Sequence, residues 1–302
     1  MIPISEKDLK EALHYLSVIF RAHRVEPDTV SIERFEDGIS NKNYLVSFKD
    51  APDDRYALRI PGYGSEGMVD RTDERCNNRL ASQLGITSEL VYFNADDGVK
   101  VAKYIEGAET MHADSIKSRE NLRQVAAILR TLHSAPIRFH KDFNVFTEIH
   151  RYEKLLDNVN GKMYDGYYEV RDRILGLEDS MNTMGLRVAP CHCDTLAENW
   201  IKGADGRIHL IDWEYSGMND PYWDVTAPFI EDDFSEEDEE YFLEQYFEGN
   251  VPTVAAEKVL YYKILMDYLW SIWARVKELD GADLREYGLM RLARALENLK
   301  KF

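Results

Sequence analysis

Cysteine and long apolar runs are both scarce in this chain. It has three cysteines among 302 residues, an odd and irregularly spaced set that predicts no disulfide framework and a reducing, cytoplasmic location. No apolar run approaches the roughly 20 residues that cross a bilayer. The N-terminal segment carries Glu6, Lys7 and Asp8 where a secretion signal would be apolar. We therefore expect neither a signal peptide nor membrane insertion.

Positive charge is also in deficit. The chain has 37 Lys and Arg against 55 Asp and Glu, which gives a formal net charge of -18. A surface this acidic repels the phosphate backbone of nucleic acids and anionic lipid, so we expect neither as a partner. It is compatible with a small cationic ligand, although most acidic surfaces serve only solubility. The composition predicts no particular oligomeric state.

The chain lacks internal repeats and low-complexity segments. Its first hundred residues show short β-like runs with one or two helices, and from Asp114 onward the pattern becomes helical. We predict an α+β, two-lobed architecture, with a small β-rich N-lobe over residues 1–105 and a larger, mainly helical C-lobe over 106–302. Helices are expected over residues 8–20, 72–84, 114–133, 147–158, 164–184, 237–247, 255–278 and 284–299, and strands over 30–35, 43–48, 56–60, 90–93 and 99–105.

One segment of the C-lobe combines an acid and an amide at a functional spacing. In HCDTLAEN, Asp194 precedes Asn199 by five residues. This is the spacing of a kinase catalytic loop, in which a carboxylate accepts the proton of an attacking hydroxyl and an amide oxygen holds a metal ion on the phosphates. The pattern is weak by itself. We expect His192 to hold this loop through hydrogen bonds, and we consider zinc binding by Cys191 and Cys193 a minor alternative.

A second acid strengthens this interpretation. Residues 208–214, IHLIDWE, form an apolar strand that delivers Asp212 at its end, with a Gly203-to-Gly206 turn between this strand and Asn199. The resulting hairpin carries Asn199 on one side and Asp212 on the other. Two oxygen ligands, completed by phosphate oxygens and water, suit Mg²⁺. The alternative is that Asp212 is a surface acid that caps a turn.

The segments HCDTLAENW and LIDWEYSGMNDPYWDV together resemble the choline/ethanolamine kinases, particularly their bacterial members. These belong with the aminoglycoside phosphotransferases to a protein-kinase-like superfamily. The resemblance covers most of the chain and implies the protein-kinase-like fold, with Asp194 as the base and Asn199 and Asp212 as Mg²⁺ ligands. Many relatives have Asn or Gly in place of Cys193 and Leu in place of Thr195, which concerns the subfamily more than the activity.

The N-lobe is expected to supply a cation for the phosphates of ATP. The strand YALRI inserts Arg59 into an alternating apolar pattern. Protein kinases have at this place a Lys paired with a helix Glu, and the choline kinases are similar to this chain in using Arg. We therefore assign Arg59 to the α- and β-phosphates with Glu74 as its partner. Asp73 is the alternative partner, and an exposed strand Arg is the alternative for Arg59.

Two further N-lobe segments are assigned to the nucleotide. The turn GISNKN, residues 38–43, is similar to the G-x-S-N turn of the family, so Ser40, Asn41 and Asn43 are expected to cover the phosphates. By position alone, residues 103–106 form the hinge, where the backbone of Tyr104 and Ile105 would meet adenine.

An aromatic pair on a predicted helix indicates the acceptor pocket. Trp270 and Trp273 stand three residues apart and therefore share one helix face. Aromatic faces bind quaternary ammonium groups with ~0.5–2 kcal/mol each, although such stripes are more often core. The pair is similar to the choline-pocket pair of choline kinases. The resemblance adds Tyr287 as a third wall and Glu231 as a choline-facing acid, and Glu214 is also assigned to substrate binding.

The acidic run that follows Glu231, from Asp232 to Glu240, is interpreted as helix capping and solvation. Taken together, the predicted function is Mg²⁺-dependent transfer of the γ-phosphate of ATP to the hydroxyl of a small cationic amino alcohol, with choline favoured. Ethanolamine stays open because a primary ammonium can donate hydrogen bonds to Glu231. Aminoglycosides or other amino alcohols are a further alternative. A catalytically silent binding protein of the kinase fold is the rival from another class.

Overall fold

The computed structural model describes residues 4–21, 25–35, 41–61, 69–279 and 281–302. The chain divides into two compact units. The first comprises Met1–Thr110 and Trp200–Glu214, and the second Met111–Asn199 and Tyr215–Phe302. In the described part of the chain, no helix is both long and apolar enough to cross a membrane.

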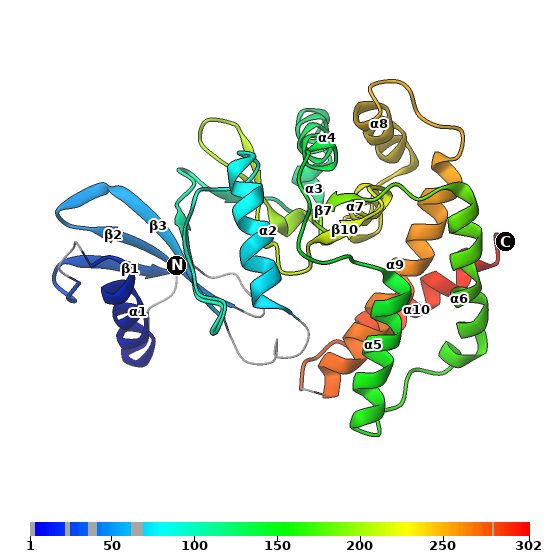
Figure 1. The fold of residues 1–302 in the computed structure, drawn as a ribbon, viewed down its shortest axis with the longest axis horizontal. Helices are drawn as coiled ribbons and strands as arrows, with labels where there is room; N and C mark the ends of the chain where they lie inside the picture. The colour runs from blue at the N-terminus through cyan, green and yellow to red at the C-terminus, as the bar shows by residue number, and fades with distance from the viewer. Residues whose placement is uncertain (1–3, 22–24, 36–40, 62–68, 280) are drawn as a thin grey trace. The chain divides into compact units, whose positions relative to one another are not determined.

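A five-stranded antiparallel sheet forms the centre of the first unit, with the order β1-β2-β3-β5-β4 (Figure 1). In its register Leu58 lies opposite Val101, and Arg59 lies opposite Lys100. Because successive side chains of a strand point to opposite faces, these two pairs face opposite sides of the sheet. The strands are β1 (Val30–Arg34), β2 (Asn41–Phe48), β3 (Ala51–Pro61), β4 (Leu90–Phe93) and β5 (Lys100–Lys103).

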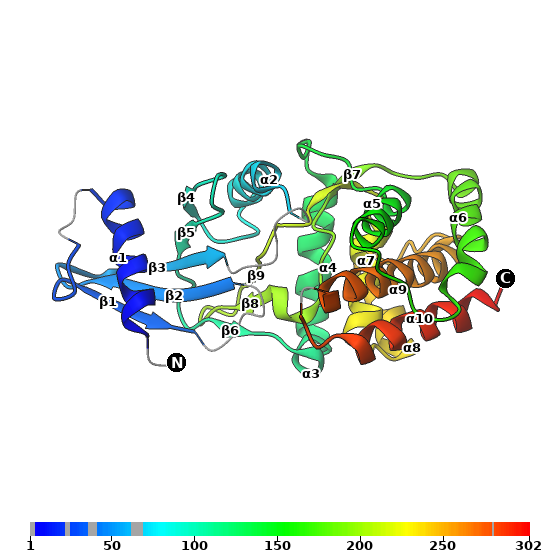
Figure 2. The ribbon, with the colours of Figure 1, turned by 90° about the horizontal axis from the view of Figure 1, so that it is seen from below.

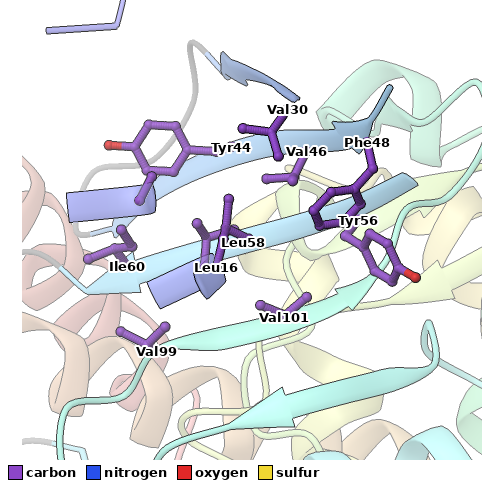
Figure 3. Packing of buried hydrophobic residues seen from close by; sticks show 11 residues of the cluster. Leu16, Val30, Tyr44, Val46, Phe48, Tyr56, Leu58, Ile60, Val99 and Val101 are labelled. Carbon is purple, nitrogen blue, oxygen red and sulfur yellow. The ribbon is translucent and has the colours of Figure 1, made fainter. Parts of the chain in front are cut away.

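One face of this sheet carries the apolar core of the first unit. Helix α1 (Glu6–Ile19) packs on that face and buries Ala12 and Leu16 against the sheet. Figure 3 shows Leu16 among Val46 and Leu58, with Val99 and Val101 at the side of β5. Ser5 caps the helix by accepting a hydrogen bond from the amide of Asp8 at 3.1 Å.

Helix α2 (Arg71–Gln83) belongs to the opposite face, because Arg59 and Lys100 point there and both approach Glu74 of this helix. The side chain of Asp70 caps the helix by accepting hydrogen bonds from the amides of Thr72 and Asp73. The first unit therefore has one apolar and one charged sheet face, and the charged face is where the phosphate-binding residues were expected.

The predicted hairpin between Asn199 and Asp212 is confirmed. Strands β8 (Trp200–Lys202) and β9 (Ile208–Leu210) pair antiparallel, and Gly206 in the turn has a φ of +79°. The hairpin joins β6 (Glu109–Thr110) in a three-stranded sheet. The amide of Leu210 donates to the carbonyl of Ile86 at 2.9 Å, which ties the hairpin to the rest of the first unit.

The second unit is mainly helical, as the sequence predicted. Its longest helix, α9 (Ala255–Leu279), contacts α5, α7 and α10, and Figure 2 shows α10 running alongside it. A two-stranded sheet pairs β7 (Ala189–Cys191) with β10 (Gly217–Asn219). The other helices are α3 (Ala113–Ile116), α4 (Arg119–Ser134), α5 (Val145–Asn158), α6 (Tyr167–Met184), α7 (Tyr222–Glu231), α8 (Glu236–Tyr246) and α10 (Arg285–Leu299).

Two elements of the second unit differ from the prediction. The single helix expected over residues 114–133 is divided into α3 and α4, because Ser118 starts α4 as an N-cap and accepts from the amide of Asn121 at 3.2 Å. Helix α7 was not predicted, because it is apolar on every side and contains Pro228, which normally ends a helix.

The sheet core of the first unit can be tested with one pair of matched substitutions. Val101 is fully buried in β5, whereas Val91 in β4 is 39% exposed. We expect Val101→Ala to lower the free energy of unfolding by about 2 kcal/mol, since it removes buried methyl groups and leaves a cavity. Val91→Ala should change it by less than about 0.5 kcal/mol. Urea denaturation followed by circular dichroism measures both, and equal effects would contradict the described core.

Candidate active site

Arg59 of β3 is almost completely buried and lies between two acids of the first unit. Its Nη1 is 2.6 Å from Oε1 of Glu74 and 3.2 Å from Oδ1 of Asp212, and its Nη2 donates to the carbonyl of Gly98 at 3.3 Å. Of the two acids that the sequence left open as partners, Glu74 forms the ion pair. Arg59 is therefore not an exposed strand residue, and two carboxylates fix its guanidinium.

Asp212 reaches Arg59 from an unusual backbone conformation. Its φ of +62° lies in the left-handed region, which costs a non-glycine residue about 1–3 kcal/mol and is tolerated where surrounding contacts impose it. The residue follows directly after β9 and Ile211, so the turn out of the strand and the ion pair with Arg59 occur at the same place. Asp212 thus comes two residues after the strand rather than at its end, and its carboxylate belongs to the charged face of the first unit.

Two more cations surround Glu74, and neither was predicted. Arg71 at the start of α2 places Nη1 2.6 Å from Oε2 of Glu74 and 3.1 Å from Oε2 of Glu214. Lys100 of β5 places Nζ 3.8 Å from Oε1 of Glu74. The partner of Glu214 in this structure is therefore a cation of the first unit, and its assignment to the acceptor pocket stays a prediction.

Glu74 and Glu214 differ in their affinity for protons. Burial would raise the pKa of Glu74, but Arg59 and Lys100 outweigh it and hold that pKa at about 2. Burial and the neighbouring charge of Asp212 raise the pKa of Glu214 to about 7. Burial and the charge of Arg59 lower the pKa of Lys100. Glu74 is consequently a permanent anion that keeps Arg59 in place at every physiological pH.

In the second unit, the predicted base and the predicted metal-holding amide are in contact. Nδ2 of Asn199 donates to Oδ2 of Asp194 at 2.9 Å and to its backbone carbonyl at 2.7 Å. Both hydrogens of the amide are used in this way. The Asn199 oxygen Oδ1 is then the atom left to bind a cation, and it is an oxygen ligand of the kind that Mg²⁺ takes. The segment from Asp194 to Asn199 thus turns back on itself through the 3₁₀ turn Ala197–Asn199.

A buried carboxylate braces the start of this loop. Asp224 of α7 accepts the amide of His192 at 2.6 Å and the amide of Cys193 at 2.8 Å, and its Oδ2 is 3.0 Å from Nε2 of His133. Cys193 has a φ of +67°, in the left-handed region that Gly and Asn enter most readily. Asp224 therefore supports the loop. The structure also places His192 in the loop with its backbone held.

The proline inside α7 provides a second attachment for the loop. Pro228 has no N–H, so it cannot donate to the carbonyl of Asp224 one turn earlier. The hydroxyl of Thr195 donates to that carbonyl instead, at 2.7 Å. The indole Nε1 of Trp223 also donates to the carbonyl of Cys193 at 3.1 Å. Helix α7 thereby holds the loop on both sides of Asp194.

The buried group of His133, Cys191 and Asp224 has ligand atoms within 4.8 Å of one another. Both oxygens of Asp224 already accept hydrogen bonds, and Nδ1 of His133 is 2.7 Å from the hydroxyl of Tyr246. Burial raises the pKa of Cys191 well above its usual value, so the thiolate that a metal needs is disfavoured. We interpret this group as a hydrogen-bonded core.

The three predicted walls of the acceptor pocket lie together. The ring centroids of Trp270 and Trp273 are 6.2 Å apart with planes at 83°, and those of Trp273 and Tyr287 are 6.3 Å apart at 74°. Two rings that the sequence did not indicate extend this aromatic cluster: Tyr215 at 5.9 Å and Trp223 at 6.5 Å from Trp270. Since Trp223 also binds the loop through Cys193, the cluster and the loop are joined.

Glu231 lies at the end of α7 and forms an ion pair with Arg291 of α10. Nη2 of Arg291 also donates to the hydroxyl of Tyr287 at 2.8 Å. Burial raises the pKa of Glu231, and Arg291 opposes that effect. Burial raises the pKa of Tyr287 as well, and the charges of Glu231 and Asp194 contribute to the same shift. The acid, the tyrosine and the predicted base are therefore within electrostatic reach of one another.

The segments predicted to bind the nucleotide belong to the first unit. Asn41 and Asn43 begin β2, where Asn43 is the cross-strand partner of Arg59, whereas Ser40 lies outside the described residues. The amide of Tyr104 donates to the carbonyl of Arg55 at 3.0 Å, and the carbonyl of Ile105 accepts from Ala108. The assignments of these residues to phosphate and adenine stay predictions.

Comparison with known proteins identifies the family. The model of a family described as choline/ethanolamine kinase matches residues 32–295. The chain belongs to the choline/ethanolamine kinase family. The predicted family is confirmed, and as a member of it the chain is a phosphotransferase.

Individual relatives of this kinase agree with the family model. Protein LicA of Haemophilus influenzae is 30% identical over 277 residues, which cover 87% of this chain and 78% of that protein. The crystal structure of choline kinase LicA from Streptococcus pneumoniae matches with a TM-score of 0.84 and 35% identity, covering 97% of this chain and 99% of that one. A LicA structure in complex with AMP matches with a TM-score of 0.81 at 35% identity, covering 97% and 98%.

The wider fold is confirmed too. An ADP-bound aminoglycoside phosphotransferase matches with a TM-score of 0.66 at 17% identity, over 97% of this chain and 98% of that one. At this identity the match shows the fold alone. The α+β, protein-kinase-like architecture predicted for the kinase, with a β-rich first part and a helical second part, is therefore correct.

One acid at the catalytic loop of this kinase corrects the sequence interpretation. The acidic run from Asp232 to Glu240 is predicted to be solvated, but Asp232 is only 2% exposed. Its Oδ1 accepts the amide of Ala197 at 3.2 Å, and its Oδ2 has no hydrogen-bond partner within the described residues. Burial raises its pKa to about 7. The sequence did not indicate that Asp232 is buried, because it lies in an acidic run with the residues of α8. In the structure Asp232 is the C-cap of α7, whereas Ser235 is the N-cap of α8.

The Asp232 carboxyl should make stability depend on pH. Its pKa is higher in the folded than in the unfolded chain, so its contribution is full below about pH 4 and is lost as the pH rises through 7. Asp232→Asn keeps an oxygen for Ala197 but cannot ionise. We expect the melting temperatures of variant and wild type to be close at pH 4, and the variant to melt at least ~2–4 °C higher at pH 8. Exposed Asp233→Asn is the control, and parallel curves for Asp232→Asn would contradict the buried acid.

Proposed function

We propose that this chain is a choline kinase that transfers the γ-phosphoryl group of ATP to the hydroxyl of choline, giving phosphocholine and ADP. The observation that carries the proposal is the aromatic cluster of Trp270, Trp273 and Tyr287 joined to the loop of Asp194 and Asn199 within one unit. The relatives support it: one similar solved structure is named choline kinase, and another contains AMP.

Asp194 is the proposed base. Its carboxylate accepts the proton of the choline hydroxyl while the oxygen forms a bond to the γ-phosphorus, and the bond from that phosphorus to the β-phosphate bridging oxygen breaks as ADP leaves. The transfer is direct and needs no phosphoenzyme. One N–H of Asn199 orients the Asp194 carboxylate for this step, and the other binds the backbone carbonyl of Asp194.

The residues also fit a magnesium ion and the phosphates of ATP. Asn199 contributes an amide oxygen and Asp212 a carboxylate, the donor types that Mg²⁺ prefers. Bound there, the ion would neutralise charge on the transferring phosphoryl group. That Asn199 and Asp212 serve one ion is part of the proposal. Arg59, fixed by Glu74, binds the α- and β-phosphates. Ser40, Asn41 and Asn43 cover the phosphates, and the backbone of Tyr104 and Ile105 meets adenine.

Choline is favoured over other amino alcohols because of the walls of the pocket. A quaternary ammonium has no N–H group, so hydrogen bonds cannot select it, but aromatic faces attract it. Trp270, Trp273 and Tyr287 offer three such faces at steep angles to one another. The family includes ethanolamine kinases by its description, so ethanolamine is the second candidate acceptor. The cytoplasmic location predicted from the sequence belongs to the same proposal.

Removal of the proposed base should abolish turnover. We expect Asp194→Asn to lower kcat by about 10²–10⁴-fold, since an amide cannot accept the hydroxyl proton. ATP binding, measured by calorimetry, should stay within about twofold because the Arg59 cluster is untouched. Release of ADP with choline as acceptor measures turnover. Asp172→Asn on the exposed face of α6 is the control. Activity near the wild-type level in Asp194→Asn would reject this base.

Loss of one aromatic wall should affect one substrate. Trp270→Leu keeps an apolar but smaller side chain and loses the indole face, so we expect the KM for choline to rise by about 2–30-fold, the equivalent of one cation–π contact. The KM for ATP should stay within about twofold. Tyr168→Leu, at an exposed aromatic residue of α6, is the control. Equal increases in both constants would instead indicate a general role of Trp270 in folding.

A further inference from the structure

The acid predicted to face the substrate ammonium is already neutralised by the protein. Glu231 is paired with Arg291, whose side chain is only 1% exposed. Nη1 of Arg291 donates to Oδ1 of Asp267 at 2.9 Å, and Asp267 is fully buried. Arg294 pairs with both oxygens of Asp267, at 2.6 and 2.7 Å. These four residues form a chain of alternating charges, which we call the Glu231–Arg294 network.

The network has no net charge, because two carboxylates face two guanidinium groups. Arg291 takes up hydrogen-bond acceptors on the side of the aromatic cluster: one oxygen of Glu231, and the hydroxyl of Tyr287 at 2.8 Å. Its guanidinium also lies over the Tyr287 ring, 4.8 Å from the centroid. In the described part of the chain, the indole Nε1 of Trp273 is a buried donor without an acceptor. At this end of the cluster, the Trp273 indole is a donor, and Arg291 already binds one oxygen of Glu231 and the Tyr287 hydroxyl.

We expect this end of the aromatic cluster to bind ethanolamine and choline with different affinities. The –NH₃⁺ group of ethanolamine loses hydrogen bonds to water on entering the pocket and needs acceptors to replace them. A site that leaves buried N–H groups unpaired discriminates strongly against the ligand that carries them. The trimethylammonium group of choline has no N–H, and ring faces alone satisfy it.

We propose that Arg291 is a positioning residue that sets acceptor selectivity. By holding Glu231 and the Tyr287 hydroxyl, it withholds the acceptors that a primary ammonium requires, and so favours a quaternary ammonium. This inference rests on the proposed function, and it concerns which amino alcohol that same site prefers.

The test measures kcat/KM for choline and for ethanolamine in the same preparation of each variant, so that any unfolded fraction cancels in the ratio. In Arg291→Gln, Glu231 loses its cation and becomes available to a primary ammonium. We expect the choline-to-ethanolamine ratio to fall about tenfold, equivalent to about 1.4 kcal/mol. The KM for ATP should stay within about twofold.

Arg294→Gln is the matched control. It makes the same chemical change on the same helix and also removes a partner of Asp267, but Arg294 contacts Asp267 and the carbonyl of Ile230 rather than Glu231 or Tyr287. Its ratio should stay within about twofold of wild type. The double variant Glu231→Gln with Arg291→Gln removes the freed carboxylate, and we expect it to lose the gain for ethanolamine.

Arg291 is buried between two acids, so its removal leaves charges unpaired and destabilises the fold. Arg291→Lys retains the cation and serves where Arg291→Gln does not fold. A single ammonium cannot span Asp267, Glu231 and Tyr287 as the guanidinium does, so the ratio should fall here too, by a smaller factor. An unchanged ratio in the folded variants, or an equal fall in Arg294→Gln, would overturn the inference. A wild-type enzyme that does not phosphorylate choline would reject the proposed function itself.

Discussion

The buried carboxylate of Asp224 is the interaction on which the catalytic loop depends. It accepts two consecutive amides, those of His192 and Cys193, and is also hydrogen-bonded to His133. Cys193 is held in a left-handed conformation that a non-glycine residue avoids without support. Each amide left unpaired in this interior would cost about 1–3 kcal/mol. The direction in which Asp194 leaves β7 is therefore fixed by a side chain thirty residues further along the chain.

Both units bury arginine, but with different results. Burying a charge is costly unless partners surround it, and each buried guanidinium here lies between two carboxylates: Arg59 between Glu74 and Asp212, and Arg291 between Glu231 and Asp267. In the first unit the acids hold in place the cation that we propose binds the phosphates of ATP. In the second unit the cation pairs with an acid that, by the inference above, would otherwise favour a primary ammonium.

Local spacing made much of the site predictable. Asp194 and Asn199 are five positions apart, and Trp270 and Trp273 are one helical turn apart. Both are short-range patterns, and side chains at such spacings meet when the local loop or helix forms. The family resemblance extended the prediction to Tyr287, whose ring does contact Trp273. The order of strands and helices followed from the same periodicities, so most elements lie within a few residues of their predicted bounds.

What the sequence did not indicate depends on pairs far apart in the chain. Arg71 meets Glu214 across 143 positions, and Arg291 meets Glu231 across 60. Charged residues are numerous here, so no pattern distinguishes these partners from the others before the chain is folded. One contact of each arginine follows from helix spacing, because Arg71 lies three residues before Glu74 and Arg291 lies four residues after Tyr287. The second, long-range contact of each arginine depends on the tertiary fold.

The hydrogen bond that Pro228 cannot make leaves one carbonyl of helix α7 free to bind the catalytic loop. A regular helix would direct the carbonyl of Asp224 along its own axis, to an amide one turn later. Proline withholds that amide, and the hydroxyl of Thr195 occupies the vacated position. Any other residue at position 228 would restore the amide and stabilise the isolated helix, but that amide would compete with the Thr195 hydroxyl for the Asp224 carbonyl. The same carbonyl can therefore serve either the regular hydrogen bonding of α7 or the attachment of the loop, and in this chain it serves the loop.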